Sequence, residues 1–288
     1  MRIKYYIKEM RVHHYIKNLL VLVPLACSGQ LFDLNKLLAC AIGFVAFCAI
    51  SSVIYTINDI RDKEKDRLHP TKRDRPIASG AVSVKQAWTL ACALLLVAVF
   101  CNSRVFYPVS SLLLLLYLCM NLAYSFGMKS VPVLDVTILV AGFLVRVLYG
   151  ACITEITVSN WLYMTVIALA FYFALGKRRN ELKRVSGGET RNVLKRYPVS
   201  FLDKNMYMCL GLANAFYALW SMDEETTAHY HSNYLIFTVP IVLLITMKYS
   251  LDVEGESDGD PVEVLLHDKV LLVLCLLYFF VMFAILYL

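Results

Sequence analysis

The segment from Asn58 to Asp66 reads Asn-Asp-Ile-Arg-Asp-Lys-Glu-Lys-Asp and follows an apolar run that is long enough to cross a membrane. If this segment is helical, Asn58, Asp62 and Asp66 recur every four residues and share one face, with Asp59 beside them. Carboxylates clustered in this way repel one another unless a cation lies between them. Mg²⁺ typically takes one or two protein carboxylates and completes its shell with phosphate oxygens and water. The spacing therefore predicts a magnesium site for a diphosphate, held by Asp62 and Asp66 with Asn58 as a further ligand and Asp59 in support.

A block of cations follows directly: Arg67, His69, Lys72, Arg73 and Arg75. Arginine forks and lysine ammonium groups suit phosphate oxygens, so we expect Lys72, Arg73 and Arg75 to hold the rest of an anionic ligand. The alternative is a solvated loop of mixed charge between two membrane helices. The four-residue spacing of the oxygen ligands and the adjoining turn at 76–80 favour the binding site.

Ionisable residues also occur in and beside a later apolar run. Tyr124 and Lys129 flank a short loop, and Asp135 and Arg146 lie in the run that follows. Asp135 and Arg146 are eleven residues apart, which is close to three helical turns, so their side chains share a face, about 16 Å apart along the axis. Ionisable groups inside a membrane helix normally face the protein interior or a wet cavity, which makes Asp135 and Arg146 substrate-binding candidates. Tyr124 and Lys129, beside the loop, are candidates as well. Two alternatives stay open: Lys129 as a topology anchor, and Arg146 paired with a buried acid of another helix.

Two further polar groups lie at predicted helix ends. Lys177 and Arg178 open the loop after the sixth apolar run, and Lys17 and Asn18 lie where the first run enters the membrane. We expect Lys177 and Arg178 to contact phosphate, and Lys17 and Asn18 to grip a lipid phosphate. The alternative for both pairs is anchoring at the membrane interface. An acidic stretch at 252–263 is either a solvated loop or a set of contacts to metal or ribose hydroxyls.

The composition indicates an integral membrane protein. The 288 residues are 59% hydrophobic and only 17% charged, and the mean hydropathy is +0.61, whereas a soluble domain carries about 25% charged residues. The nine cysteines form no C-x-x-C pair, which argues against a zinc site or a disulfide framework. The net charge of +6 does not indicate nucleic-acid binding, because most of the positive residues lie in the loops on one side of a membrane.

The apolar runs predict nine membrane-spanning helices of about 17 to 25 residues each. They lie at 16–32, 36–57, 86–103, 105–124, 132–153, 160–176, 205–222, 232–249 and 268–287. Of the 28 Lys and Arg residues, all but Lys36, Arg104 and Arg146 fall in the N-terminal segment and in the loops on one side, which predicts a cytoplasmic N-terminus. We therefore expect one multi-pass domain over 1–288 in the cell membrane. Its cytoplasmic loops 58–85, 125–131, 177–204 and 250–267 would cap the active site.

Several blocks of the chain together resemble a known family. Asn58 to Asp66 looks like the first aspartate-rich motif, N-D-x-x-D-x-x-x-D, of the UbiA superfamily of intramembrane prenyltransferases. Within it, the chain most resembles the decaprenyl-phosphate phosphoribosyltransferase family. This resemblance rests on His69 to Gly80, Lys129 to Asp135, Gly142 to Arg146 and Ala174 to Leu182, spread over most of the chain. It implies an all-α fold with the helices around a central cavity.

The chain departs from the wider superfamily after the sixth helix. Members that use prenyl diphosphates carry a second D-x-x-x-D motif there, which binds a second Mg²⁺, whereas this chain reads Lys-Arg-Arg-Asn-Glu from Lys177 to Glu181. Cations in place of acids suit a direct contact with phosphate. The resemblance implies transfer of a 5-phosphoribosyl group from 5-phosphoribosyl diphosphate to a long-chain, decaprenyl-like polyprenyl phosphate. The resemblance also implies Mg²⁺ as the cofactor and membrane lipids as the environment of the protein. It implies that the product enters a cell-wall furanose pathway.

Two other functions stay open at this point. One is an aromatic prenyltransferase of the same fold, which joins a prenyl diphosphate to a ring acceptor. The other is a non-catalytic carrier or channel for anionic lipids that uses the same charged loops only to bind. A homo-oligomer also stays open. We expect Asn58, Asp59, Asp62 and Asp66 to be the catalytic residues of the enzyme.

Overall fold

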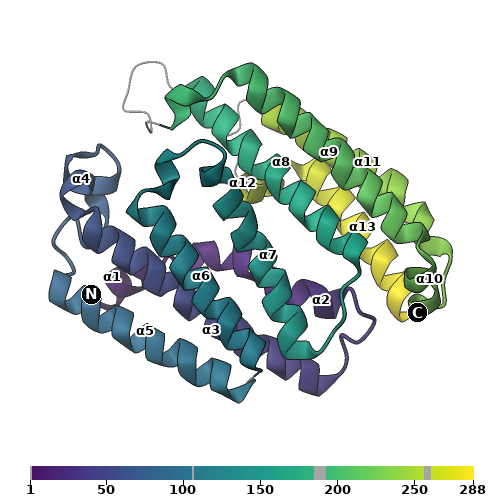
Figure 1. Cartoon of the computed structure of the whole chain (residues 1–288), viewed down its shortest axis with the longest axis horizontal. Helices are drawn as coiled ribbons and strands as arrows, with labels where there is room; N and C mark the ends of the chain where they lie inside the picture. The colour runs from purple at the N-terminus through teal and green to yellow at the C-terminus, as the bar shows by residue number, and fades with distance from the viewer. Residues whose placement is uncertain (1, 106, 185–192, 256–260) are drawn as a thin grey trace. The chain divides into compact units, whose positions relative to one another are not determined.

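The computed structural model describes residues 2–105, 107–184, 193–255 and 261–288, and every regular element in these ranges is a helix (Figure 1). The predicted all-helical fold class is thus confirmed. The chain divides into two compact units. Unit 1 comprises Met1–Phe126 and Val145–Thr157, and unit 2 comprises Gly127–Leu144 and Val158–Leu288.

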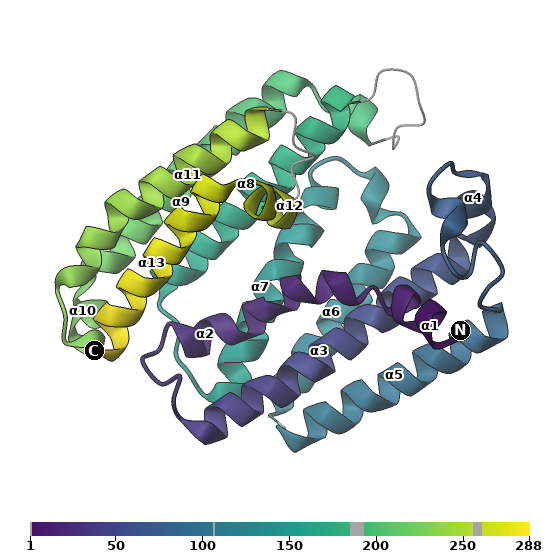
Figure 2. The same ribbon diagram turned by 180° about the vertical axis from the view of Figure 1, so that it is seen from behind.

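Unit 1 is built on the long helix α3, Leu34–Arg61. Before it come α1 (Arg2–Met10), the 3-10 helix η1 (Val12–Leu22) and α2 (Val23–Ala26). After it come α4 (Lys63–Leu68), η2 (Lys72–Asp74), α5 (Val84–Arg104), α6 (Pro108–Phe126) and the second half of α7 (Leu134–Thr154). Helices α3 and α5 lie side by side in both views, and Figure 2 shows the N-terminal helices running along α3.

Local sequence signals explain where these helices start and how they pack. The Asp33 carboxylate accepts hydrogen bonds from the backbone of Asn35 and Lys36 at the start of α3, and Ser83 with Gln86 forms a capping box at the start of α5. Apolar side chains of α3, α6 and α7 form the core, with Phe47, Tyr117 and Tyr149 at its centre. Gly150 permits a close approach, because a Cβ atom there would lie 2.0 Å from the Val21 carbonyl oxygen.

Unit 2 contains the first half of α7, preceded by η3 (Met128–Ser130), and the long pair α8 (Asn160–Arg184) and α9 (Val199–Met222). Between α8 and α9 lies η4 (Leu194–Arg196); α10 (Glu224–Tyr230), η5 (Tyr234–Thr238), α11 (Val239–Glu254), α12 (Pro261–His267) and α13 (Lys269–Tyr287) follow. Helices α8 and α9 pack along their length (Figures 1 and 2). Tyr172, Leu202, Met206 and Val253 are fully buried in their shared core with α11.

Six helices of the described chain are long and apolar enough to cross a membrane: α3, α5, α6, α7, η5 with α11, and α13. The chain is therefore a multi-pass membrane protein. Each of the nine predicted ranges overlaps a helix, although the first, 16–32, is 3-10 helix as far as Leu22, α-helix from Val23 to Ala26, and not helical beyond that. The total of nine spans and the cytoplasmic N-terminus stay predictions.

The described connections are shorter than predicted. The loop expected to begin at Lys177 does not begin there, because α8 continues to Arg184 through residues that favour helix. Likewise α11 extends to Glu254, and α12 occupies 261–267. Of the acidic stretch 252–263, residues 256–260 lie outside the described residues.

Candidate functional site

The aspartate motif straddles the end of α3 and keeps the predicted helical spacing. Asp62 closes α3, and its N–H donates to the carbonyl of Asn58 at 2.9 Å, while the Asp66 N–H donates to the carbonyl of Asp62 at 2.8 Å. Asp59 and Asp66 are buried, whereas Asn58 and Asp62 are half-buried. These backbone bonds place all four oxygen-bearing side chains on about two successive helical turns.

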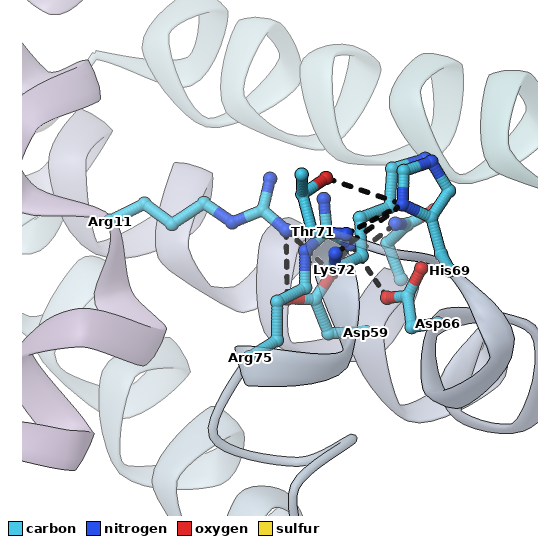
Figure 3. Close-up of polar contacts among 8 residues, drawn as sticks. Arg11, Asp59, Asp66, His69, Thr71, Lys72 and Arg75 are labelled. Atoms are coloured by element: carbon cyan, nitrogen blue, oxygen red, sulfur yellow. Dashed lines mark hydrogen bonds and ion pairs between the residues drawn. The ribbon is translucent and has the colours of Figure 1, made fainter.

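Two arginines neutralise the buried carboxylates (Figure 3). Arg75 Nη1 lies 3.1 Å from Asp59 Oδ1 and 2.7 Å from Asp66 Oδ2, so one guanidinium bridges both acids. Arg11 Nη2 donates to both oxygens of Asp59, at 2.6 and 2.7 Å. The four side chains form one cluster of alternating charge, which we call the carboxylate–arginine cluster.

Arg11 is a residue of this cluster that the sequence analysis counted only as a topology charge. It separates α1 from η1 and has φ of 52°, a left-handed conformation that is uncommon for a residue other than glycine. Backbone strain of this kind costs about 1–3 kcal/mol and is typical of functional sites. No local signal could have revealed its role, because its partner lies 48 positions further along the chain.

Glu9, on the last turn of α1, is a second residue that the sequence analysis missed. Its side chain is only 1% exposed, and neither carboxylate oxygen has a hydrogen-bond partner among the described residues. The pKa of Glu9 is raised to about 7, mainly by burial and also by the charge of Asp59, while Arg11 and Arg75 oppose the rise. The charges of the carboxylate–arginine cluster therefore act on the Glu9 carboxylate.

The predicted cations near the motif have different surroundings. Arg75 belongs to the cluster, whereas Lys72 is half-buried and Arg73 is exposed. The His69 ring nitrogen Nδ1 accepts from the Thr71 N–H at 3.2 Å and from the Lys72 N–H at 3.4 Å, which shapes the turn that carries them (Figure 3). Of the three predicted phosphate ligands in this loop, Arg75 contacts two of the aspartates, Asp59 and Asp66.

The donor chemistry of the motif fits a hard divalent cation, because Asn58, Asp59, Asp62 and Asp66 offer only oxygen ligands. Among the described residues, however, no three His, Cys, Asp or Glu side chains converge closely enough to hold an ion. Arg75 lies between Asp59 and Asp66 and supplies the positive charge that two buried acids require. Its side chain is 27% exposed, against 3% for Asp59 and 7% for Asp66.

Arg146 is buried in unit 1 and is held by Asn18. Its Nε donates to Asn18 Oδ1 at 2.8 Å and its Nη2 to the Tyr117 hydroxyl at 2.7 Å. The guanidinium carbon also lies over the rings of Phe47 and Tyr117, at 5.3 and 4.9 Å from their centroids. Asn18 was expected to grip a lipid phosphate; its side chain is buried and positions Arg146. Lys17, its neighbour, is half-buried.

Asp135 and Arg178 meet in unit 2 as a buried ion pair. Arg178 Nε donates to Asp135 Oδ2 at 2.8 Å, and Nη1 donates to Glu181 at 2.9 Å. The Tyr197 hydroxyl donates to Asp135 Oδ1 at 2.6 Å, and burial together with this bond raises the pKa of Tyr197 to about 12. Arg178 is 2% and Asp135 0% exposed, so a described acid already binds the guanidinium that was expected to contact phosphate.

Arg179 and Asn180, which follow Arg178, connect α8 to α9 and α11. Arg179 Nε donates to Asp203 of α9 at 2.5 Å, and its Nη2 donates to Glu254 of α11. Asn180 donates to the Val253 carbonyl at 2.8 Å. Glu254 belongs to the acidic stretch 252–263, so the first part of that stretch forms an ion pair with Arg179. Lys177, two residues before Arg179, is half-buried.

A second feature of unit 2 is an apolar groove of about 320 Å³. Its walls come from α8 and α9, with Met164, Phe171, Phe201 and Phe216 among them, and Tyr197 lines it as well.

Tyr124 and Lys129, both half-buried, lie on α6 of unit 1 and on η3 of unit 2.

The fold and the site define a multi-pass, all-helical membrane protein with an oxygen-rich, arginine-neutralised cluster at a helix end. Residues 19–261 match the UbiA prenyltransferase family. The chain is 36% identical to a decaprenyl-phosphate phosphoribosyltransferase of Mycolicibacterium smegmatis, over 94% of this chain and 88% of that one. It is 35% identical to a protein of the same name from Corynebacterium glutamicum, over 95% and 84%.

Among solved structures, a UbiA homologue from Archaeoglobus fulgidus bound to GPP and Mg²⁺ superimposes with a TM-score of 0.71, at 19% identity, over 98% of this chain and 99% of that one. The chain belongs to the UbiA prenyltransferase family and is a transferase. The family resemblance read from the sequence is thus confirmed.

Proposed function

We propose that this protein transfers a 5-phosphoribosyl group from 5-phosphoribosyl diphosphate to a long-chain polyprenyl phosphate at the cytoplasmic face of the cell membrane. The anomeric C–O bond to diphosphate breaks, an oxygen of the acceptor phosphate forms the new bond to that carbon, and diphosphate leaves. The two relatives above, which match nearly the whole chain, support this reaction. The observation on the molecule that carries it is the carboxylate–arginine cluster, because it combines oxygen ligands with cations in one place.

Asp62 and Asp66 would hold Mg²⁺, with Asn58 as a further ligand and Asp59 in support. The bound ion would neutralise charge on the leaving diphosphate. Arg75 gives up its place between Asp59 and Asp66 in that state and becomes available to a phosphate oxygen of the donor. Arg11 keeps its two bonds to Asp59 and so fixes the acid that stays.

The remaining predicted residues would bind the rest of the two substrates. Lys72, Arg73, Lys129 and Lys177 are our candidates for phosphate contacts, because the donor carries a 5-phosphate in addition to its diphosphate. Asp135, Tyr124, Arg146 and Lys17 complete the proposed set, with Arg178 positioning Asp135 and Asn18 positioning Arg146. The acceptor phosphate is anionic at neutral pH, so the reaction requires no strong general base.

The test is an assay of purified protein with labelled 5-phosphoribosyl diphosphate and polyprenyl phosphate, beside a prenyl diphosphate and a hydroxybenzoate. We expect a phosphoribosylated lipid and free diphosphate. Prenylated hydroxybenzoate without phosphoribosylated lipid would instead identify the aromatic prenyltransferase, and binding of anionic lipid without any product would identify the carrier.

A further inference from the structure

The N-terminal helix α1 is docked directly against the carboxylate–arginine cluster. Lys8 Nζ donates to the Asp74 carbonyl at 3.0 Å, and the Ser52 hydroxyl donates to the Met10 carbonyl at 2.9 Å. The next residue, Arg11, binds Asp59. Glu9 lies between these three contacts, so its position relative to α3 and to the turn after α4 is fixed on both sides.

The Glu9 carboxylate is the unexplained group in this region. A buried acid without a hydrogen-bond partner is costly, and the cost grows when the acid is ionised. The two arginines nearby donate to other acids instead, because Arg11 bonds to both oxygens of Asp59, and Arg75 is shared by Asp59 and Asp66. The described contacts thus leave the Glu9 carboxylate, beside the cluster, without a hydrogen-bond donor of its own.

A hydrated divalent cation accounts for this arrangement. Mg²⁺ dehydrates reluctantly and keeps several water molecules when it binds through one or two carboxylates. Each such water has hydrogens to donate, and acids of the outer shell commonly accept them. Glu9 does not converge with two other acids on a common point, so an outer-shell role fits it better than direct ligation.

We propose that Glu9 is a positioning residue of the cation site, whose carboxylate accepts hydrogen bonds from water bound to the ion that the aspartate motif holds. This inference rests on the proposed magnesium site. In this proposal α1 helps to assemble the cation site, because Glu9 lies on α1 and not in the aspartate motif. Glu9 touches neither substrate nor the reacting atoms in this role.

The test measures Mn²⁺ binding to purified, substrate-free protein by electron paramagnetic resonance titration. We expect Glu9→Gln, which keeps the size of the side chain, to weaken Mn²⁺ binding about ten- to a hundredfold. Glu9→Asp, which keeps the charge, should lie between that variant and the unaltered protein. The matched control is Glu64→Gln, because Glu64 lies in the same motif and its side chain is 75% exposed. It should bind Mn²⁺ as the unaltered protein does.

Asp66→Asn separates the two levels of the inference. If it loses Mn²⁺ binding while Glu9→Gln and Glu9→Asp bind within twofold of the unaltered protein, the metal site stands and the role of Glu9 is refuted. If Asp66→Asn also binds Mn²⁺ normally, the magnesium site itself is refuted, and the role of Glu9 with it. Thermal unfolding of each variant verifies that it is folded.

Discussion

Replacing Arg178 with methionine tests whether this residue supports the fold or contacts the donor. The side chain is 2% exposed, and it is bound to Asp135, which is fully buried. Arg178→Met keeps most of the side-chain volume and removes the charge. The change leaves the Asp135 carboxylate buried with Tyr197 as its remaining described side-chain partner.

The expected magnitude follows from this burial. Breaking a buried ion pair by removing one partner costs about 3–5 kcal/mol, because the other charge stays uncompensated. The second contact of Arg178, to the partly exposed Glu181, adds less, since exposed pairs contribute at most about 1 kcal/mol. We therefore expect the free energy of unfolding to fall by about 3–5 kcal/mol. In Arg178→Met/Asp135→Asn, which removes both charges, most of this loss should be recovered.

The assay is reversible unfolding in mixed micelles with increasing sodium dodecyl sulfate, accompanied by the KM for 5-phosphoribosyl diphosphate on folded protein. Lys183→Met, on the same helix, is the matched control for loss of a cation. Unchanged stability of Arg178→Met, with a donor KM raised ten- to a hundredfold, would contradict this reasoning and return Arg178 to the ligand-binding residues.

Chelation or Asp66→Ala should abolish turnover of folded protein, and Mg²⁺ or Mn²⁺ should restore only the chelated sample; full activity without metal would refute the magnesium site. Lys177→Ala should raise the donor KM about ten- to a hundredfold, since a charge-assisted hydrogen bond contributes roughly 1.5–3 kcal/mol, and Lys85→Ala should not. In metal-free protein, the raised pKa of Glu9 contributes stability that is complete below about pH 4.5 and is lost as the pH rises through about 7. Glu9→Gln should flatten this decline, which amounts to roughly 3 kcal/mol at most, and an equally steep decline in that variant would contradict it.

The aspartate motif could be predicted because its geometry is local. Helical periodicity places Asn58, Asp62 and Asp66 one turn apart, and the backbone bonds at the end of α3 preserve this spacing. Hydropathy likewise located the long helices, because a membrane span is a property of a continuous stretch. It could not distinguish a 3-10 helix from an α-helix in η1, since hydropathy reports how apolar a stretch is and not which backbone hydrogen bonds it forms.

The pairing of charges could not be predicted, because it depends on which helices pack together. The sequence shows Arg178 and Asp135 as two candidates for substrate contacts, whereas the fold brings them together over 43 positions. Arg11 and Asp59 are a similar case over 48 positions. The sequence supplies the acids and the cations, but tertiary contacts decide which cations are already neutralised and which can still bind a phosphate.

This distinction separates the cations of the cluster into two kinds. Arg11 binds both oxygens of one buried acid from a strained backbone position, so moving it would leave Asp59 without its closest counter-ion. Arg75 divides one nitrogen between two acids and is more exposed, so it would lose less if the proposed divalent cation replaced it. A site that binds both metal and phosphate needs such an exchangeable cation, because carboxylates without any counter-ion would oppose folding before the ligand arrives. In this protein Arg75 has the contacts and the exposure for that role, and Arg11 has those of a permanent support.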